Sequence, residues 1–207
     1  MPKPRTKSVP ELFGLPEQPT QGRERLLAAA IDLFYRHGFA AVGVDQIIAA
    51  AGVTKTTFYK HFESREELMV AAVVRRDEWE SAAWIRLVRE RAGDDPRSQL
   101  LAFFDVMDLW FNDPEFHGCM FGNAANEFPN PHDPVHQAAA HVQQRYRDHR
   151  RDLALAAGTD ATSAESFADA YTALVQGALV LRQTQGRDDA ARVMKPVVEQ
   201  LVRTMLG

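Results

Sequence analysis

The stretch "GVTKTTFYKHF", residues 52–62, is short, polar and basic in a chain whose formal net charge is −4. A turn of three to four residues containing Gly52 separates it from the preceding apolar segment, which is the spacing of a helix-turn-helix. Glycine adopts the positive φ that such a turn needs, and Thr54 is a suitable N-cap for a helix that follows. The sequence therefore predicts three helices around this turn, at residues 21–37, 44–51 and 54–60.

The third predicted helix is too short to be stable alone in water, so it needs anchors in a core. Val53, Phe58 and Phe62 are spaced to face inward. The remaining side chains donate hydrogen bonds of the kind that phosphates and base edges accept. The alternative is a solvated surface helix whose lysines have no partner. The residues expected to contact DNA on this helix are Thr54, Lys55, Thr56, Thr57, Tyr59, Lys60 and His61.

The sequence between residues 21 and 74 resembles the DNA-binding domain of the tetracycline-repressor (TetR) family. The matching positions are Phe34, Gly38, Ile47, Ala51, Gly52, Val53, Lys55, Thr57, Tyr59, Phe62, Ser64 and Leu68. The resemblance implies a homodimeric transcriptional regulator, usually a repressor, that binds a palindromic DNA operator and is released by a small molecule. It implies that this effector binds in the C-terminal domain.

Two positions depart from the family pattern. The family often has Ser or Thr at the start of the second helix, where this chain has Val42 and Gly43. Glycine is an acceptable N-cap, but a phosphate contact there needs the backbone amide of Gly43 or Val44, and we include Gly43 among the expected DNA contacts. The family commonly has Gly or Ala at position 56, so Thr56 is the first candidate for a residue that determines operator specificity.

The rest of the chain also has helical periodicity. Residues 1–19 contain five prolines and no apolar period, which predicts a flexible arm. Ser64 and Glu67 form a capping-box pattern, and Thr162 with Glu165 forms another. The further helices are expected from 64 into the high eighties and at about 96–113, 117–127, 133–157, 162–185 and 188–206. The fold class is all-α with about nine helices, divided into a helix-turn-helix domain at 20–63 and a larger ligand-binding and dimerisation domain at 64–207.

Charge and composition indicate which part of the chain binds a polyanion and where in the cell the protein is expected. Residues 1–62 hold eight Lys/Arg against five Asp/Glu, a balance of +3, whereas the remainder has a balance of −7. Only the first part is therefore expected to meet a polyanion. The single cysteine, the lack of a long apolar run and the lack of an apolar leader make the cytoplasm the expected location.

A ligand site is expected in the second domain. The predicted helical segment at 100–111 is apolar on more than one side. The predicted helical segment at 117–128 is also apolar but contains a few polar residues. Asn123 and Glu127 are spaced i,i+4 on one face and are expected to orient a mostly apolar effector. Core packing of the aromatic residues and an interhelical or exposed Asn/Glu pair are the alternatives. The expected ligand-binding residues are Phe104, Met107, Trp110, Phe121, Asn123 and Glu127.

Five of the seven histidines fall in one segment: His117, His132, His136, His141 and His149. Their spacing is not that of metal ligands, because Pro134 separates the second from the third and an i,i+5 pair diverges on a helix. Cys119 and His117 do not form a nucleophile–base pair, and no phosphate loop or hydrolase motif is present. We expect no enzyme, no cofactor and no bound metal. The alternative to a ligand-responsive regulator is a metal-responsive regulator, or a small-molecule carrier that does not read DNA.

The last two helices are expected to form the dimer interface. Each has apolar residues at helical spacing, and against its two-fold mate the pair would form a four-helix bundle. Pro196 is expected to kink the last helix, because it removes one backbone hydrogen bond. The expected dimerisation residues are Tyr171, Leu174, Gly177, Ala178, Leu181, Val197 and Leu201.

Overall fold

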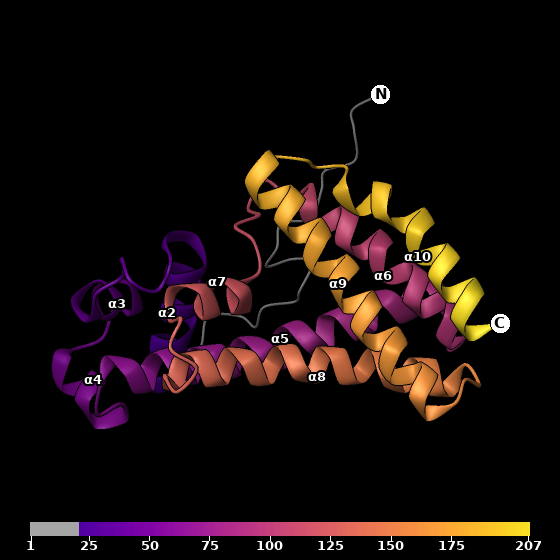
Figure 1. The fold of residues 1–207 in the computed structure, drawn as a ribbon. Helices are drawn as coiled ribbons and strands as arrows, with labels where there is room; N and C mark the ends of the chain where they lie inside the picture. The colour runs from indigo at the N-terminus through magenta and orange to yellow at the C-terminus, as the bar shows by residue number, and fades with distance from the viewer. Residues whose placement is uncertain (1–20) are drawn as a thin grey trace. The chain divides into compact units, whose positions relative to one another are not determined.

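A computed structural model describes residues 21–207, which form nine helices and no strand (Figure 1). The all-α prediction is confirmed for these residues, and the expected flexible arm lies outside them. None of the described helices is long and apolar enough to cross a membrane. The helices are α2 (Gly22–His37), α3 (Val44–Ala51), α4 (Lys55–His61), α5 (Arg65–Ala92), α6 (Pro96–Phe111), α7 (Met120–Glu127), α8 (Pro134–Ala156), α9 (Ala161–Gln185) and α10 (Ala190–Leu206).

The described residues divide into two compact units that do not follow chain order. The N-terminal unit contains residues 21–80 and 117–143, and the C-terminal unit contains residues 81–116 and 144–207. Helices α5 and α8 are each divided between the two units, α5 after Glu80 and α8 after Gln143. The N-terminal unit therefore contains α7 and the start of α8 in addition to the predicted helix-turn-helix domain.

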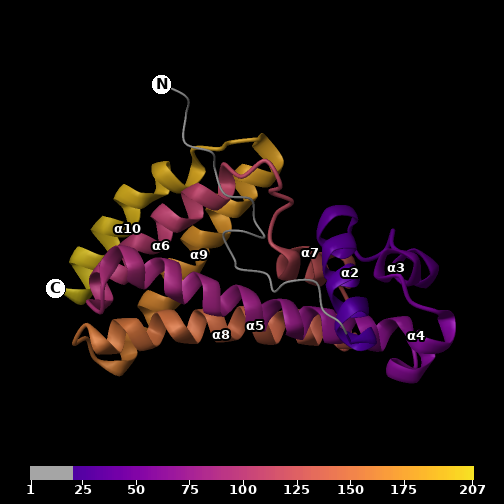
Figure 2. The same cartoon turned by 180° about the vertical axis from the view of Figure 1, so that it is seen from behind.

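In the N-terminal unit, α2 packs against both α3 and α4 (Figures 1 and 2). Helix α2 ends at Gly38, whose φ of 82° and ψ of 162° lie in a region that only glycine adopts readily. The chain then folds back, so that the ring of Phe39 stacks on that of Phe34 at 4.6 Å between centroids. Glycine at position 38 therefore ends α2 and lets the chain pack back onto it.

In the C-terminal unit, α10 lies along both α6 and α9 (Figure 2). The core of this unit is aromatic. Tyr171 is fully buried, its hydroxyl donates to the carbonyl of Leu100 at 2.6 Å, and its ring makes a T-shaped contact with that of Phe104. Burial raises the pKa of Tyr171 above its ordinary value. Ion pairs of 2.6 Å (Lys195–Asp105) and 2.8 Å (Arg192–Asp108) join the exposed sides of α10 and α6.

Two helix starts differ in detail from the predicted capping boxes. Ser64 Oγ accepts from the amide of Glu67 at 3.0 Å, as predicted, but the Glu67 carboxylate accepts from the amide of Glu63 rather than Ser64. Helix α9 begins one residue earlier than predicted. Asp160 is its N-cap and accepts from the amides of Thr162 and Ser163, because its carboxylate offers a stronger acceptor than a threonine hydroxyl. Helix α10 continues through Pro196, and the kink there stays a prediction.

Candidate nucleic-acid interface

The turn between α3 and α4 is built on Gly52, which has φ 60° and ψ 38°, the left-handed conformation predicted from the sequence. Its amide donates to the carbonyl of Ala49 at 3.1 Å, and its own carbonyl accepts from Arg25 Nη2 of α2 at 3.1 Å. A Cβ atom at position 52 would lie 2.6 Å from that Nη2 atom. The turn is therefore fixed both by its backbone conformation and by a side chain of α2.

Helix α4 has only seven residues and is held at both ends. The side chain of Thr54 accepts from the amide of Thr57 at 3.1 Å, so the predicted N-cap is confirmed. Phe58 and Phe62 are 0% and 1% exposed, which places one face of the helix in the core, whereas Val53 is half-buried. These contacts substitute for the length that an isolated helix would need.

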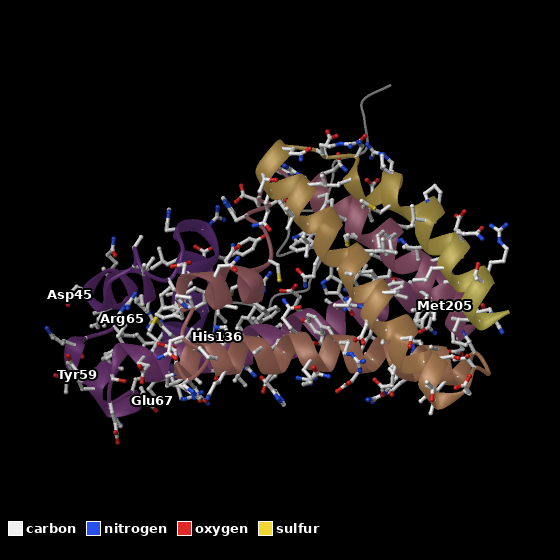
Figure 3. All side chains as sticks on the ribbon, viewed as in Figure 1. Asp45, Tyr59, Arg65, Glu67, His136 and Met205 are labelled. Atoms are coloured by element: carbon white, nitrogen blue, oxygen red, sulfur yellow. The ribbon has the colours of Figure 1, made fainter. Side chains whose placement is uncertain are left out.

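The opposite face of α4 is exposed and rich in hydrogen-bond donors. Tyr59 is 56% exposed, and its ring makes a T-shaped contact with that of Phe58 at 5.1 Å between centroids. Its side chain and that of Asp45 on α3 both project from the unit (Figure 3). Asp45 lies 3.8 Å from Lys55 Nζ in an exposed ion pair. Five of the predicted DNA contacts are exposed on this face: Thr54, Lys55, Thr56, Tyr59 and Lys60.

Two of the predicted contacts do not face outward. Thr57 and His61 are half-buried, and a Cβ atom at Gly22 of α2 would lie 3.0 Å from Thr57 Cγ2 and 3.4 Å from His61 Nε2. Both are therefore only partly exposed, because residues four apart share one face of the helix and this face lies beside α2. Their contact with DNA stays a prediction.

The start of α3 revises the role of Gly43. Its amide donates to Oε1 of Gln46 at 2.7 Å, so this N–H is engaged within the helix start and is not free to meet a phosphate. Val42, which departs from the family pattern, is 2% exposed and fills the core. The amide of Val44, the first helical residue, has no intrahelical acceptor and is the remaining backbone candidate.

Two residues organise this region that the sequence interpretation did not place there. Arg65 of α5 donates to the carbonyl of Val42 at 2.9 Å and to that of Phe39. The carboxylate of Glu127, at the end of α7, accepts from the amides of Phe39 and Ala40 at 3.1 and 2.7 Å. The spacing of Glu127 with Asn123 predicts a place in a ligand site for this residue instead, and no periodicity or motif distinguishes Arg65 from its neighbours.

Comparison with known proteins agrees with this geometry. Residues 26–72 match the family model "Bacterial regulatory proteins, tetR family", and residues 96–197 match "Tetracyclin repressor-like, C-terminal domain". The chain belongs to the TetR family. Its members are ligand-responsive, DNA-binding regulators of transcription, so the helix-turn-helix described above is the DNA-reading part of a transcriptional regulator.

The relatives of this TetR-family chain match it over different lengths. The HTH-type transcriptional regulator LmrA of Bacillus subtilis is 25% identical over 170 residues, which cover 78% of this chain and 86% of LmrA. The HTH-type transcriptional activator FasR of Mycolicibacterium smegmatis is 35% identical over 89 residues, 42% of this chain and 40% of FasR. A crystal structure of a TetR-family regulator from Streptomyces coelicolor has a TM-score of 0.77 at 27% identity, covering 90% of this chain and 96% of that one.

The residues expected to bind the effector of this TetR-family chain fall in both units. Phe104, Met107 and Trp110 are buried in the C-terminal unit, and Phe121 is buried in the N-terminal unit. Trp110 meets Trp84 edge-on at 5.8 Å between ring centroids. Their part in ligand binding stays a prediction.

The two polar residues expected to orient the effector have backbone partners instead. Asn123 Nδ2 donates to the carbonyl of His117 at 3.1 Å, and the Glu127 carboxylate is bound by two amides as described above. Both side chains stabilise turns of the chain. Their expected part in orienting the effector stays a prediction.

The histidine-rich segment and the cysteine carry structural contacts. His136 Nδ1 lies 2.7 Å from the carbonyl of Phe128. The pKa of the Cys119 thiol is raised to about 11, mainly by burial and to a smaller extent by the negative charge of Glu80. The thiol therefore stays protonated at neutral pH. Among the residues that the structure describes, no three His, Cys, Asp or Glu side chains gather in a metal-sized group.

The expected dimerisation residues divide between two faces. Tyr171 and Ala178 are fully buried within the protomer, so their assignment to a surface that meets a partner is wrong. They lie seven residues apart, two turns on one face of α9, and that face packs on the protomer's own core. Val197 is 48% exposed. Four others are half-exposed: Leu174, Gly177, Leu181 and Leu201.

Proposed function

We propose that this regulator is a repressor that binds a palindromic operator as a homodimer and is released by a small, mostly apolar molecule. The observation that carries the DNA-binding part is the division of α4 into two faces. Phe58 and Phe62 are buried, while lysine, threonine and tyrosine side chains on the opposite face are exposed. Such a helix suits the major groove, because its exposed groups reach phosphates and base edges.

We assign the exposed residues of α4 different roles. Tyr59 and Lys60 hold phosphates, whereas Thr56 meets base edges, with Val44 offering a backbone amide to a phosphate. Two copies of α4, about 34–36 Å apart in a symmetric dimer, would read the two half-sites of an operator. Since a regulator of transcription must reach its DNA operator, we place the protein in the cytoplasm.

We assign the effector to the domain that follows the helix-turn-helix, at residues 64–207. Phe104, Met107 and Trp110 lie on the inner side of α6, and buried aromatic side chains of this kind favour a mostly apolar molecule with one or two polar groups. Such a molecule releases DNA only if it binds better to a conformation that cannot read the operator.

The DNA-binding proposal is tested on duplexes that the wild-type protein selects from a random library. We expect Lys60→Ala to weaken binding to every duplex about equally and to lower the slope of log K against log salt by about one unit. Asp45→Asn, which removes a carboxylate beside Lys55, should strengthen binding instead. The control is Arg203→Ala, at an exposed position on α10, which should change neither the affinity nor the salt slope. A loss at Lys60 confined to some sequences would contradict the phosphate assignment.

The effector proposal is tested by titrating a compound library against the protein–DNA complex and measuring release of a labelled duplex. We expect Trp110→Ala to keep DNA binding and lose release by a compound that acts on the wild type. Trp110→Phe, which keeps an aromatic ring in the core, should retain part of the response. Ile85→Ala, at an exposed position on α5, is the control. Full release from the Trp110→Ala protein would move the site away from α6.

A further inference from the structure

The turn between α2 and α3 is held by a carboxylate that comes from a distant part of the chain. Glu127, the last residue of α7, accepts from the amides of Phe39 and Ala40 at 3.1 and 2.7 Å. The approach to Gly38 is close, because a Cβ atom there would lie 2.9 Å from Glu127 Oε1 and the carboxylate would have to shift. One side chain thus binds two consecutive backbone amides at the end of α2.

The same turn is held from its carbonyl side by Arg65 of α5, which donates to the carbonyls of Phe39 and Val42. In residues 39–42, the negatively charged Glu127 therefore binds backbone amides and the positively charged Arg65 binds backbone carbonyls. This turn ends at Val42, whose side chain is buried, and α3 begins two residues later at Val44. The turn therefore determines the direction in which α3 leaves α2. Helix α3 in turn leads into α4 through the Gly52 turn.

Helix α7 is attached to α2 by further contacts within the N-terminal unit. Before its start, the amide of His117 donates to the hydroxyl of Tyr35 at 3.1 Å, and the two rings meet edge-on at 5.3 Å. After its end, the ring of Phe128 meets that of Phe39 edge-on at 6.2 Å. The segment from His117 to Phe128 therefore contacts the last turn of α2 before α7 begins and the turn that follows α2 after α7 ends.

We infer that Glu127 is a positioning residue for operator binding, and that α7 is the element through which the helix-turn-helix is held in its DNA-reading conformation. The carboxylate fixes residues 39–42, this turn fixes α3, and α3 fixes the exposed face of α4. A displacement of α7 would withdraw the carboxylate and release the turn. The inference rests on the DNA contacts proposed above for α4.

The test compares Glu127→Ala and Glu127→Gln with Asn126→Ala, a matched control at the exposed neighbouring position of α7. The probe is a duplex selected by the wild-type protein from a random library. We expect Glu127→Ala to weaken binding to this duplex about tenfold, because two charge-assisted hydrogen bonds are lost. Glu127→Gln, which keeps one acceptor oxygen, should show a smaller loss, and Asn126→Ala none. An unchanged affinity in the Glu127→Ala protein would overturn the inference.

Amide hydrogen exchange separates positioning from a general loss of stability. By linkage, duplex binding should slow the exchange of the Phe39 and Ala40 amides in the wild type, and much less in Glu127→Ala. Affinities are referred to the fraction of active protein, measured by stoichiometric titration, so that partial unfolding cannot imitate the effect. Equal protection of both amides in the two proteins would also overturn the inference. Failure of the wild type to select any duplex would instead contradict the proposed function.

Discussion

Thr56 and Thr57 are adjacent residues of the same type with different surroundings. Thr56 is exposed at the second position of α4. Thr57 is half-buried beside Gly22, its amide donates to Thr54 Oγ1, and the two hydroxyl oxygens lie 2.9 Å apart. A hydroxyl that faces solvent is available to a base edge, whereas one bound within the N-cap contributes to stability.

We predict that Thr56→Ala changes the ranking of operator variants without changing affinity for unrelated DNA. A contact at a base edge contributes roughly 1–3 kcal/mol of discrimination. Thr57→Ala should instead lower the free energy of unfolding, by about 1 kcal/mol, and leave the ranking unchanged. Competition binding over a panel of single-base operator variants checks the first, and urea unfolding checks the second. The same ranking for Thr56→Ala and the wild type would exclude Thr56 from the base-reading face.

For individual residues, the sequence predicted the environment of large apolar side chains but not that of several polar ones. The positions of Phe58 and Phe62 followed from their spacing, because large apolar residues have one favourable environment. Thr57, His61 and Glu127 are polar residues that suit either surface or interior. Their roles depended on neighbours brought from α2 and from the α2–α3 turn.

At the scale of the element, α4 depends on the turn that precedes it. Seven residues cannot form a stable helix alone, so the Gly52 turn, the Thr54 cap and the two phenylalanine anchors supply its stability. The turn also determines the angle between α3 and α4. Its conformation is therefore as important for DNA reading as the exposed side chains.

We predict that Gly52→Val destabilises the protein by about 1–2 kcal/mol or more, because a β-branched residue is strained at φ 60° and its Cβ meets Arg25. Gly52→Asn should cost less, since asparagine tolerates the left-handed region. Gly158→Asn, also at a positive φ but with open space around it, is a control outside the interface. Urea unfolding and binding to the selected duplex check the order. A Gly52→Val protein as stable as Gly52→Asn would show that the turn relaxes.

At the scale of the whole molecule, the exposed sides of α9 and α10 are the surface on which we place the second protomer. Val180, Val193 and Val197 are 54%, 45% and 48% exposed, although they are apolar. Gly177 lies on α9 with no heavy atom within 4 Å of where its Cβ would be. A larger side chain there therefore fits within the protomer, and any effect on assembly must come from the partner.

We predict that Gly177→Leu produces a folded monomer that binds the operator at least about a hundredfold more weakly, because one short helix makes too few contacts. Its unfolding midpoint should not fall, since leucine favours a helix by roughly 0.5–1 kcal/mol over glycine. Sedimentation and duplex binding check the prediction, with Ala82→Leu, an exposed position on α5, as the control. A dimeric Gly177→Leu protein with wild-type affinity would place the interface on another face.

The amino-acid sequence by itself determined the all-α class, the Gly52 turn, the Thr54 cap and the anchors of α4, because each follows from contacts within a few residues. Only the tertiary structure decided the rest. It buried Tyr171 and Ala178 within the protomer, turned Thr57 and His61 toward α2 and brought Glu127 to the amides of Phe39 and Ala40. These outcomes depend on which helix faces pack together and on hydrogen bonds between residues as many as 88 positions apart, and periodicity along one helix carries no information about either.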